Sequence, residues 1–102
     1  MTAMNIVHVR VKPGREADFM QVNQDLARGD MAGVRKFSVV KTGDRQYIIV
    51  GEWGNFDAIV KARPAMISNL DDMRDMLEDL GGGRGVTEPY SGEVVVEVTS
   101  AS

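Results

Sequence analysis

The side chains best suited to acid–base or anion chemistry in this sequence are one histidine and one arginine. His8 is the only histidine, and its imidazole titrates nearest to neutral pH, so it is a candidate general base. It lies between Val7 and Val9 in an alternating stretch, where it could equally be a hydrogen-bonded structural residue of a strand. Arg63 precedes Pro64 in a helical pattern, where its guanidinium could stabilise an oxyanion in a cleft or simply face solvent. His8 and Arg63 are therefore the candidate catalytic residues, and we expect them to share one cleft between the helices and the sheet near Pro64.

Three large side chains are candidates for contacts with a substrate. Tyr47 and Trp53 share one side of a predicted strand, where they could line an aromatic pocket or pack in the core. Met66 belongs to a methionine-rich helical layer, and flexible thioethers either accept a flat lipophilic ligand or fill gaps in a core. Asn5 could add one amide to the rim of such a pocket. We expect Tyr47, Trp53 and Met66 to contact a small aromatic or lipophilic ligand.

The remaining polar residues do not indicate a cofactor site. The sequence has no cysteine, which excludes disulfides, thiolate zinc sites and cysteine nucleophiles. The acidic side chains of residues 71–79 are interleaved with Arg74, a pattern typical of a solvated helix face with ion pairs along it. The glycines of residues 81–85 lack the lysine, the preceding strand and the following helix of a phosphate-binding loop. We therefore expect no metal, haem or flavin.

Length and charge narrow the class of protein. The 102 residues predict a single domain, residues 1–102, with a modest core to which a partner subunit would add buried surface. The net charge of -3 and the scattered basic residues argue against a nucleic-acid partner. No signal peptide and no membrane-spanning stretch is apparent, so we expect no membrane partner and a cytoplasmic location.

Apolar periodicity predicts four strands and two helices. Alternation with a period of two indicates strands, and apolar residues at spacings of three and four indicate helices. The expected strands cover residues 5–11, 34–41, 46–53 and 92–99, and a hairpin turn joins the second strand to the third. The first helix is expected to begin at Glu16 and to end at Gly29 as a left-handed cap, and the second helix is expected to be capped by Asn55. We expect Pro64 to kink or break the second helix, which then continues as an apolar stripe from Met66 to Leu80.

This order of elements is that of a ferredoxin-like α+β sandwich, a four-stranded antiparallel sheet with both helices on one face. The strand over residues 46–53 is apolar on both sides, which predicts a central position in the sheet. Since two helices cover only one face, the apolar side chains of the other face predict an interface. We expect a homodimer formed through the open sheet face.

The stretch GEWGNFDA, residues 51–58, resembles the end of the third strand and the following helix start in the antibiotic biosynthesis monooxygenase (ABM-like) family. VKPG at residues 11–14 and VTEP at residues 86–89 are similar to the family at the corresponding places. The resemblance implies a dimeric α+β barrel. The family includes cofactor-independent oxygenases that act on phenols and quinols, as well as haem-degrading enzymes. The haem-degrading branch carries a histidine in the helix after the tryptophan, whereas this sequence has none there, which disfavours that branch.

Three functions remain open at the level of the sequence. The first is a cofactor-independent monooxygenase of the ABM type that acts on an aromatic phenol or quinol. The second is a non-catalytic module that binds a small ligand or another protein on the same scaffold. The third is an isomerase or lyase for small organic acids, which needs a buried base and a cation such as Arg63.

Overall fold

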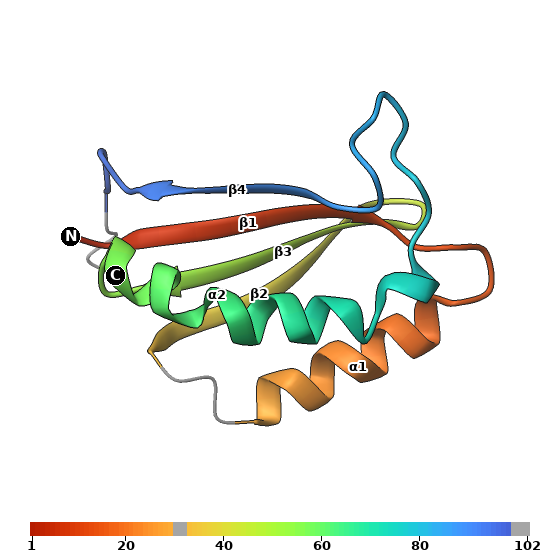
Figure 1. The fold of residues 1–102 in the computed structure, drawn as a ribbon, viewed down its shortest axis with the longest axis horizontal. Coiled ribbons are helices and arrows are strands. Elements are labelled where there is room, and N and C mark those ends of the chain that lie inside the picture. The colour runs from red at the N-terminus through yellow and green to blue at the C-terminus, as the bar shows by residue number, and fades with distance from the viewer. Residues whose placement is uncertain (30–32, 99–102) are drawn as a thin grey trace.

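The chain forms a four-stranded antiparallel sheet with both helices packed on one face, which is the predicted ferredoxin-like arrangement (Figure 1). The computed structural model describes residues 1–29 and 33–98. The strand order across the sheet is β2-β3-β1-β4. The elements in chain order are β1 (Ala3–Arg10), α1 (Glu16–Arg28), β2 (Val34–Gly43), β3 (Gln46–Trp53), α2 (Phe56–Asp71), the short 3-10 helix η1 (Arg74–Met76) and β4 (Glu88–Glu93).

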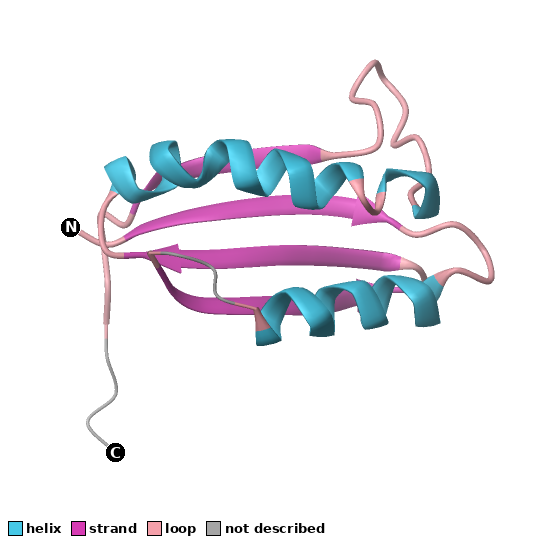
Figure 2. Ribbon diagram, turned by 60° about the horizontal axis from the view of Figure 1, so that its bottom comes forward, coloured by secondary structure: helices cyan, strands magenta, loops and turns pink. Residues whose placement is uncertain are grey.

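The central strands β1 and β3 separate a covered face of the sheet from an open face. β3 pairs with β2 on one side and with β1 on the other, so its predicted central position is confirmed. Both helices lie over the covered face, as Figure 2 shows. Every second residue of the central strands points to that face, and the buried members of this set include Val9, Tyr47, Ile49 and Trp53.

The buried side chains form two clusters beneath the helices. The larger cluster joins α1 to the sheet around Phe19 and Tyr47, whose ring centroids are 4.9 Å apart. The smaller cluster contains Ala3, Trp53 and Ile59 and holds the start of α2 against the sheet. Strand β3 therefore contributes an aromatic anchor to each cluster, one near either end.

The predicted N-cap of α2 is present in the structure, whereas the predicted left-handed cap at the end of α1 is not. The Asn55 side chain accepts a hydrogen bond from the backbone N–H of Ala58 at 2.9 Å, which confirms Asn55 as the N-cap of α2. Gly29, by contrast, has a φ of -76° and a ψ of 167°, so the prediction of a left-handed cap there is wrong. Its N–H bonds to the carbonyls of Asp25 and Leu26, which closes the last turn of α1 without a positive φ.

Pro64 does not break α2, so the break that was predicted there as the alternative to a kink is wrong. The helix runs without interruption from Phe56 to Asp71 with Pro64 inside it. Proline removes one backbone N–H, and the carbonyl that loses its partner belongs to Val60, four residues earlier. Val60 is 44% exposed and Pro64 is also exposed, so this stretch of α2 faces outward, where water can replace the missing donor.

The apolar stripe from Met66 to Leu80 is half-buried at its start and buried from Met73 onward, but only its first part is α-helical. α2 ends at Asp71, and Leu77 forms an isolated bridge with Val11 of the first strand's extension. Leu77 and Leu80 are 2% and 4% exposed. No helix within residues 1–29 and 33–98 is long and apolar enough to cross a membrane.

The fourth strand begins and ends earlier than predicted. β4 runs from Glu88 to Glu93, whereas the valine-rich stretch predicted a strand over residues 92–99, of which Thr99 lies outside the described residues. Val94 still donates its backbone N–H to the Thr2 carbonyl at 2.8 Å, but the later valines are highly exposed: Val95 at 85%, Val96 at 81% and Val98 at 92%. The prediction is wrong because β1 provides its hydrogen-bonding edge opposite residues 88–93.

The open face of the sheet carries apolar side chains at its centre. Ile6 lies between Val50 of β3 and Tyr90 of β4 in the strand register. Ile6 is 36% exposed, Val40 is 47% exposed and Tyr90 is 61% exposed. This is the apolar surface that predicts a homodimer, and neither α1 nor α2 covers it.

Candidate ligand-binding site

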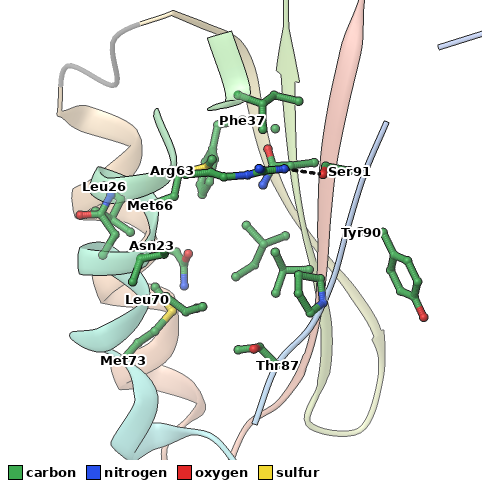
Figure 3. A pocket seen from close by; sticks show the side chains of 18 of the residues that line it. Asn23, Leu26, Phe37, Arg63, Met66, Leu70, Met73, Thr87, Tyr90 and Ser91 are labelled. Carbon is green, nitrogen blue, oxygen red and sulfur yellow. Dashed lines mark hydrogen bonds between the residues drawn. The ribbon is translucent and has the colours of Figure 1, made fainter. Parts of the chain in front are cut away.

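A cavity of about 480 Å³ lies between the covered face of the sheet and the two helices. In Figure 3 its wall is formed by side chains of α1 and α2 on one side and of the strands on the other. Small-molecule sites are typically apolar cavities of this size with a few polar groups. The apolar wall includes Val7, Leu26, Phe37, Ile49, Trp53, Ile59, Met66, Ile67, Leu70, Met73 and Pro89, and the polar groups are Asn5, Asn23, Arg63, Asn69, Arg74, Thr87 and Ser91. Tyr90 of β4 also borders the cavity, but its side chain points away from it in Figure 3.

The indole of Trp53 is held in the cavity wall by a hydrogen bond from the neighbouring strand. Trp53 Nε1 donates to Asn5 Oδ1 at 2.7 Å, and Trp53 is fully buried. Gly51 makes this contact possible, because a Cβ at that position would stand 2.8 Å from Trp53 Nε1 and closer still to Asn5 Oδ1. Asn5, Gly51 and Trp53 therefore form one unit that sets the position of the indole.

Asn23 of α1 places a polar group against an apolar wall. Its side chain is 3% exposed and points into the cavity in Figure 3. The amide Nδ2 donates to the backbone carbonyl of Phe19 at 2.9 Å. The amide Oδ1 is buried and accepts no hydrogen bond from the described residues.

Arg63 supplies a cation at the cavity between α2 and β4. Its Nη2 donates to Ser91 Oγ at 3.3 Å (Figure 3). Its guanidinium carbon lies 5.7 Å from the centre of the Phe56 ring. Within residues 1–29 and 33–98, no carboxylate forms an ion pair with Arg63, whereas Arg74 of the same cavity is paired with Asp71 at 2.6 Å. Most of the N–H donors of Arg63 thus stay available to an anionic ligand.

The predicted substrate-contacting residues are divided between the cavity and the core. Trp53 and Met66 line the cavity. Tyr47 packs on Phe19 in the larger core cluster, and its hydroxyl donates to Glu16 at 3.3 Å. Tyr47 does not line the cavity, because it lies nearer the opposite end of β3 from Trp53. The Glu16 carboxylate also raises the pKa of Lys41, which lies over the Tyr47 ring.

His8 lies on the open face of the sheet, so its grouping with Arg63 in one cleft has to be corrected. The strand alternation of β1 turns His8 away from Val7 and Val9 and hence away from the cavity. Its Nε2 lies 2.9 Å from Gln46 Oε1, and its Nδ1 lies 3.3 Å from Glu88 Oε1. Both ring nitrogens thus have protein partners. Hydrogen bonds from Arg84, and then from His8, lower the pKa of Glu88.

Sequence reasoning missed the most unusual polar group of the cavity. Asn23 lies four residues after Phe19 and three before Leu26, so it belongs to the apolar stripe of α1. A polar residue inside such a stripe was the available signal, because an amide at a buried helical position needs a specific partner. Gly51 carried a similar signal as a glycine in the middle of an apolar strand, which often marks close approach of another group.

The chain is similar to known proteins in its fold, whereas its sequence matches neither a family profile nor a curated protein. Solved structures do match over nearly the whole chain. A protein from Chloroflexus aurantiacus, provisionally described as an antibiotic biosynthesis monooxygenase, aligns with a TM-score of 0.69 at 13% identity, covering 97% of this chain and 98% of that one.

Two further structures show how broadly this fold is used. SnoaB, a cofactor-independent oxygenase from Streptomyces nogalater, aligns with a TM-score of 0.68 at 14% identity, covering 97% of this chain and 98% of its own. A conserved protein from Methanosarcina mazei aligns with a TM-score of 0.76 at 13% identity, covering 91% and 92%. The chain thus has the ABM-like fold, and the resemblance seen in its sequence is confirmed at the level of the fold.

Proposed function

We propose that the cavity binds a small aromatic phenol or quinol and that the protein is a cofactor-independent monooxygenase of the ABM type. The observation that carries this proposal is an apolar cavity of about 480 Å³ with Arg63 fixed in its wall and no carboxylate paired with it among the described residues. A flat ring gains from burial against apolar walls, and a cation favours the ionised form of a phenolic hydroxyl. The likeness in fold to a cofactor-independent oxygenase adds support.

The proposed chemistry needs only the substrate and dioxygen. Loss of the phenolic proton gives a phenolate, whose ring carbon para to the oxygen is electron-rich and transfers electrons to dioxygen. A carbon–oxygen bond forms, the resulting hydroperoxide loses water, and the ring becomes a quinone. For 1-naphthol the balance is one naphthol and one dioxygen to one 1,4-naphthoquinone and one water. Arg63 would stabilise the phenolate oxygen at the cavity mouth, and the apolar wall would hold the ring.

A non-catalytic ligand-binding module is the second candidate, and one observation favours it. The cavity-lining residues within the described part of the chain include no histidine, lysine or carboxylate that could accept the phenolic proton. In the monooxygenase this proton would pass to water at the cavity mouth, where Arg63 is exposed. A binding protein needs no such transfer.

Oxygen uptake with 1-naphthol separates the two candidates. We expect the purified protein to consume one dioxygen per naphthol and to form 1,4-naphthoquinone, with one atom from labelled dioxygen in the quinone and the other in water. The Arg63→Gln variant should do so more slowly. Saturable binding of naphthol without oxygen uptake above the protein-free rate would instead establish the binding module.

The role of Arg63 predicts a selective loss of affinity for anions. Arg63→Gln should weaken binding of 2-naphthoate by roughly tenfold, because hydrogen bonds to charged groups contribute about 1.5–3 kcal/mol and the exposure of Arg63 favours the lower end of that range. Binding of the uncharged 2-methoxynaphthalene should change little. Both affinities can be measured by isothermal titration calorimetry.

Lys61→Gln is the matched control for this prediction. Lys61 is an exposed cation on the same helix but is not part of the cavity wall. Equal losses of naphthoate affinity in the two variants would point to a general effect of net charge and would contradict the role of Arg63.

We also propose that two copies of the chain associate through the open sheet face, which would give the dimeric α+β barrel. The apolar row of Tyr90, Ile6 and Val50 supports this, because a sheet with an uncovered apolar face is normally buried against a partner. The cavity lies on the other face of the same sheet, so the dimer would leave it accessible.

A further inference from the structure

We propose that Asn23 selects ligands that present a hydrogen-bond donor to α1, so that the cavity takes an aromatic molecule with two polar ends. One end is a neutral hydroxyl that donates to Asn23 Oδ1, and the other is an anionic oxygen that accepts from Arg63. This inference rests on the proposed function, since it assumes that the cavity holds an aromatic ligand. The expected ligand is therefore a quinol-like compound or a hydroxyaryl acid rather than a simple arene.

The orientation of the Asn23 amide follows from its surroundings. Its NH2 group lies 2.9 Å from the Phe19 carbonyl, where only a donor is tolerated, so the amide oxygen must take the other position. That oxygen has no partner among the described residues and is buried. The side chain as a whole is 3% exposed, so bulk water does not reach it freely.

An unsatisfied buried acceptor costs stability, and native proteins contain few of them. Asn23 Oδ1 can accept but cannot donate, so the group that satisfies it must carry an O–H or an N–H. The oxygen belongs to a side chain that points into the cavity (Figure 3). A bound ligand is therefore a suitable donor, and an ether or a ketone in the same place would leave both oxygens unsatisfied and repelling each other.

Arg63 sets the chemistry of the second end. It projects from α2 toward Ser91 of β4, whereas Asn23 projects from α1, so the two groups approach the cavity from different elements (Figure 3). A guanidinium donates and never accepts, while Asn23 Oδ1 only accepts. The two polar groups thus make opposite demands, which a molecule with one donor end and one anionic end meets.

The test uses two naphthoates that differ in a single group. 6-Hydroxy-2-naphthoate and 6-methoxy-2-naphthoate have the same carboxylate and ring, but only the first has a donor at the distal end. In the wild-type protein, isothermal titration calorimetry should show the hydroxy compound binding at least about tenfold more tightly, as expected for one satisfied buried acceptor. In Asn23→Leu this ratio should fall to about one. In Gln24→Leu, an exposed neighbour on the same helix, the ratio should stay at its wild-type value.

A measurement without ligand separates a selecting role from a structural one. If Asn23 is kept for a ligand, Asn23→Leu should raise the Tm of the ligand-free protein by roughly 4 °C or more, because it removes an unsatisfied acceptor from an apolar wall. A lower Tm in both Asn23→Leu and the smaller Asn23→Ala would show that the amide is needed for folding and would overturn the inference. If leucine is too large for the site, the ratio of the two naphthoate affinities can be measured in Asn23→Ala instead, and it should again be about one.

The remaining outcomes distinguish this inference from the proposed function. Equal affinity of the wild-type protein for the two naphthoates would overturn the role of Asn23 and leave an aromatic-binding cavity intact. Absence of binding by either naphthoate would contradict the proposed function and the role of Asn23 together.

Discussion

Gly51→Ala is expected to lower the free energy of unfolding by about 1–3 kcal/mol, the usual cost of forcing extra volume into a packed site. The new methyl group would stand 2.8 Å from Trp53 Nε1 and closer to Asn5 Oδ1, so the hydrogen bond between these two side chains has to break or shift. Trp53 is fully buried and cannot move aside without disturbing its core cluster. The change should appear in urea unfolding and in the emission of Trp53, the only tryptophan of the chain.

Gly92→Ala is a matched control for this effect. Gly92 is also a strand glycine, but a Cβ there would meet no atom within 4 Å. The free energy of unfolding of the Gly92→Ala variant should stay the same or rise slightly, because alanine restricts the unfolded chain more than glycine does. If both variants had the same stability and unchanged tryptophan emission, the close packing of Gly51 against Asn5 and Trp53 would be disproved.

The Gly51 unit also bears on the cavity. Trp53 forms part of its wall, and Asn5 holds the indole in place from the adjacent strand. A displaced indole changes the shape of the site that a flat ligand would occupy. We therefore expect Gly51→Ala to weaken binding of 2-naphthoate as well, while Gly92→Ala leaves it unchanged.

Ile6→Glu is expected to convert the proposed homodimer into a monomer. Ile6 lies at the centre of the open face, between Val50 and Tyr90. At a two-fold interface each copy would bury an unpaired carboxylate, and an uncompensated buried charge costs about 3–5 kcal/mol. The dimer dissociation constant should rise at least about 100-fold, which sedimentation velocity at micromolar concentration would detect.

Val60→Glu controls for the effect of an added charge on an exposed apolar position. Val60 is 44% exposed against 36% for Ile6, but it lies on α2, away from the open face. This variant should remain dimeric. A wild-type protein that sediments as a monomer, or an Ile6→Glu variant that stays dimeric, would contradict association through this face.

The amino-acid sequence by itself determined which side chains share a face of each central strand. The two-residue period of β1 places His8 opposite Val7 and Val9, and the same period in β3 places Trp53 on the same side as Tyr47. Such a period depends only on backbone geometry, so it holds before any partner is known. The Asn55 cap was predictable for a similar reason, since its hydrogen bond closes within three residues.

Features that depend on distant partners were decided only by the tertiary structure. The valines after Glu93 have the composition of a strand, but β1 offers its edge to residues 88–93, and pairing rather than propensity sets the bounds of β4. Pro64 stays inside α2 because packing along the rest of the helix offsets one lost hydrogen bond. The role of Asn23 also depends on the tertiary structure. An amide in an apolar stripe meets either a donor or a cavity, according to the distance between α1, α2 and the sheet. No local sequence pattern encodes that distance.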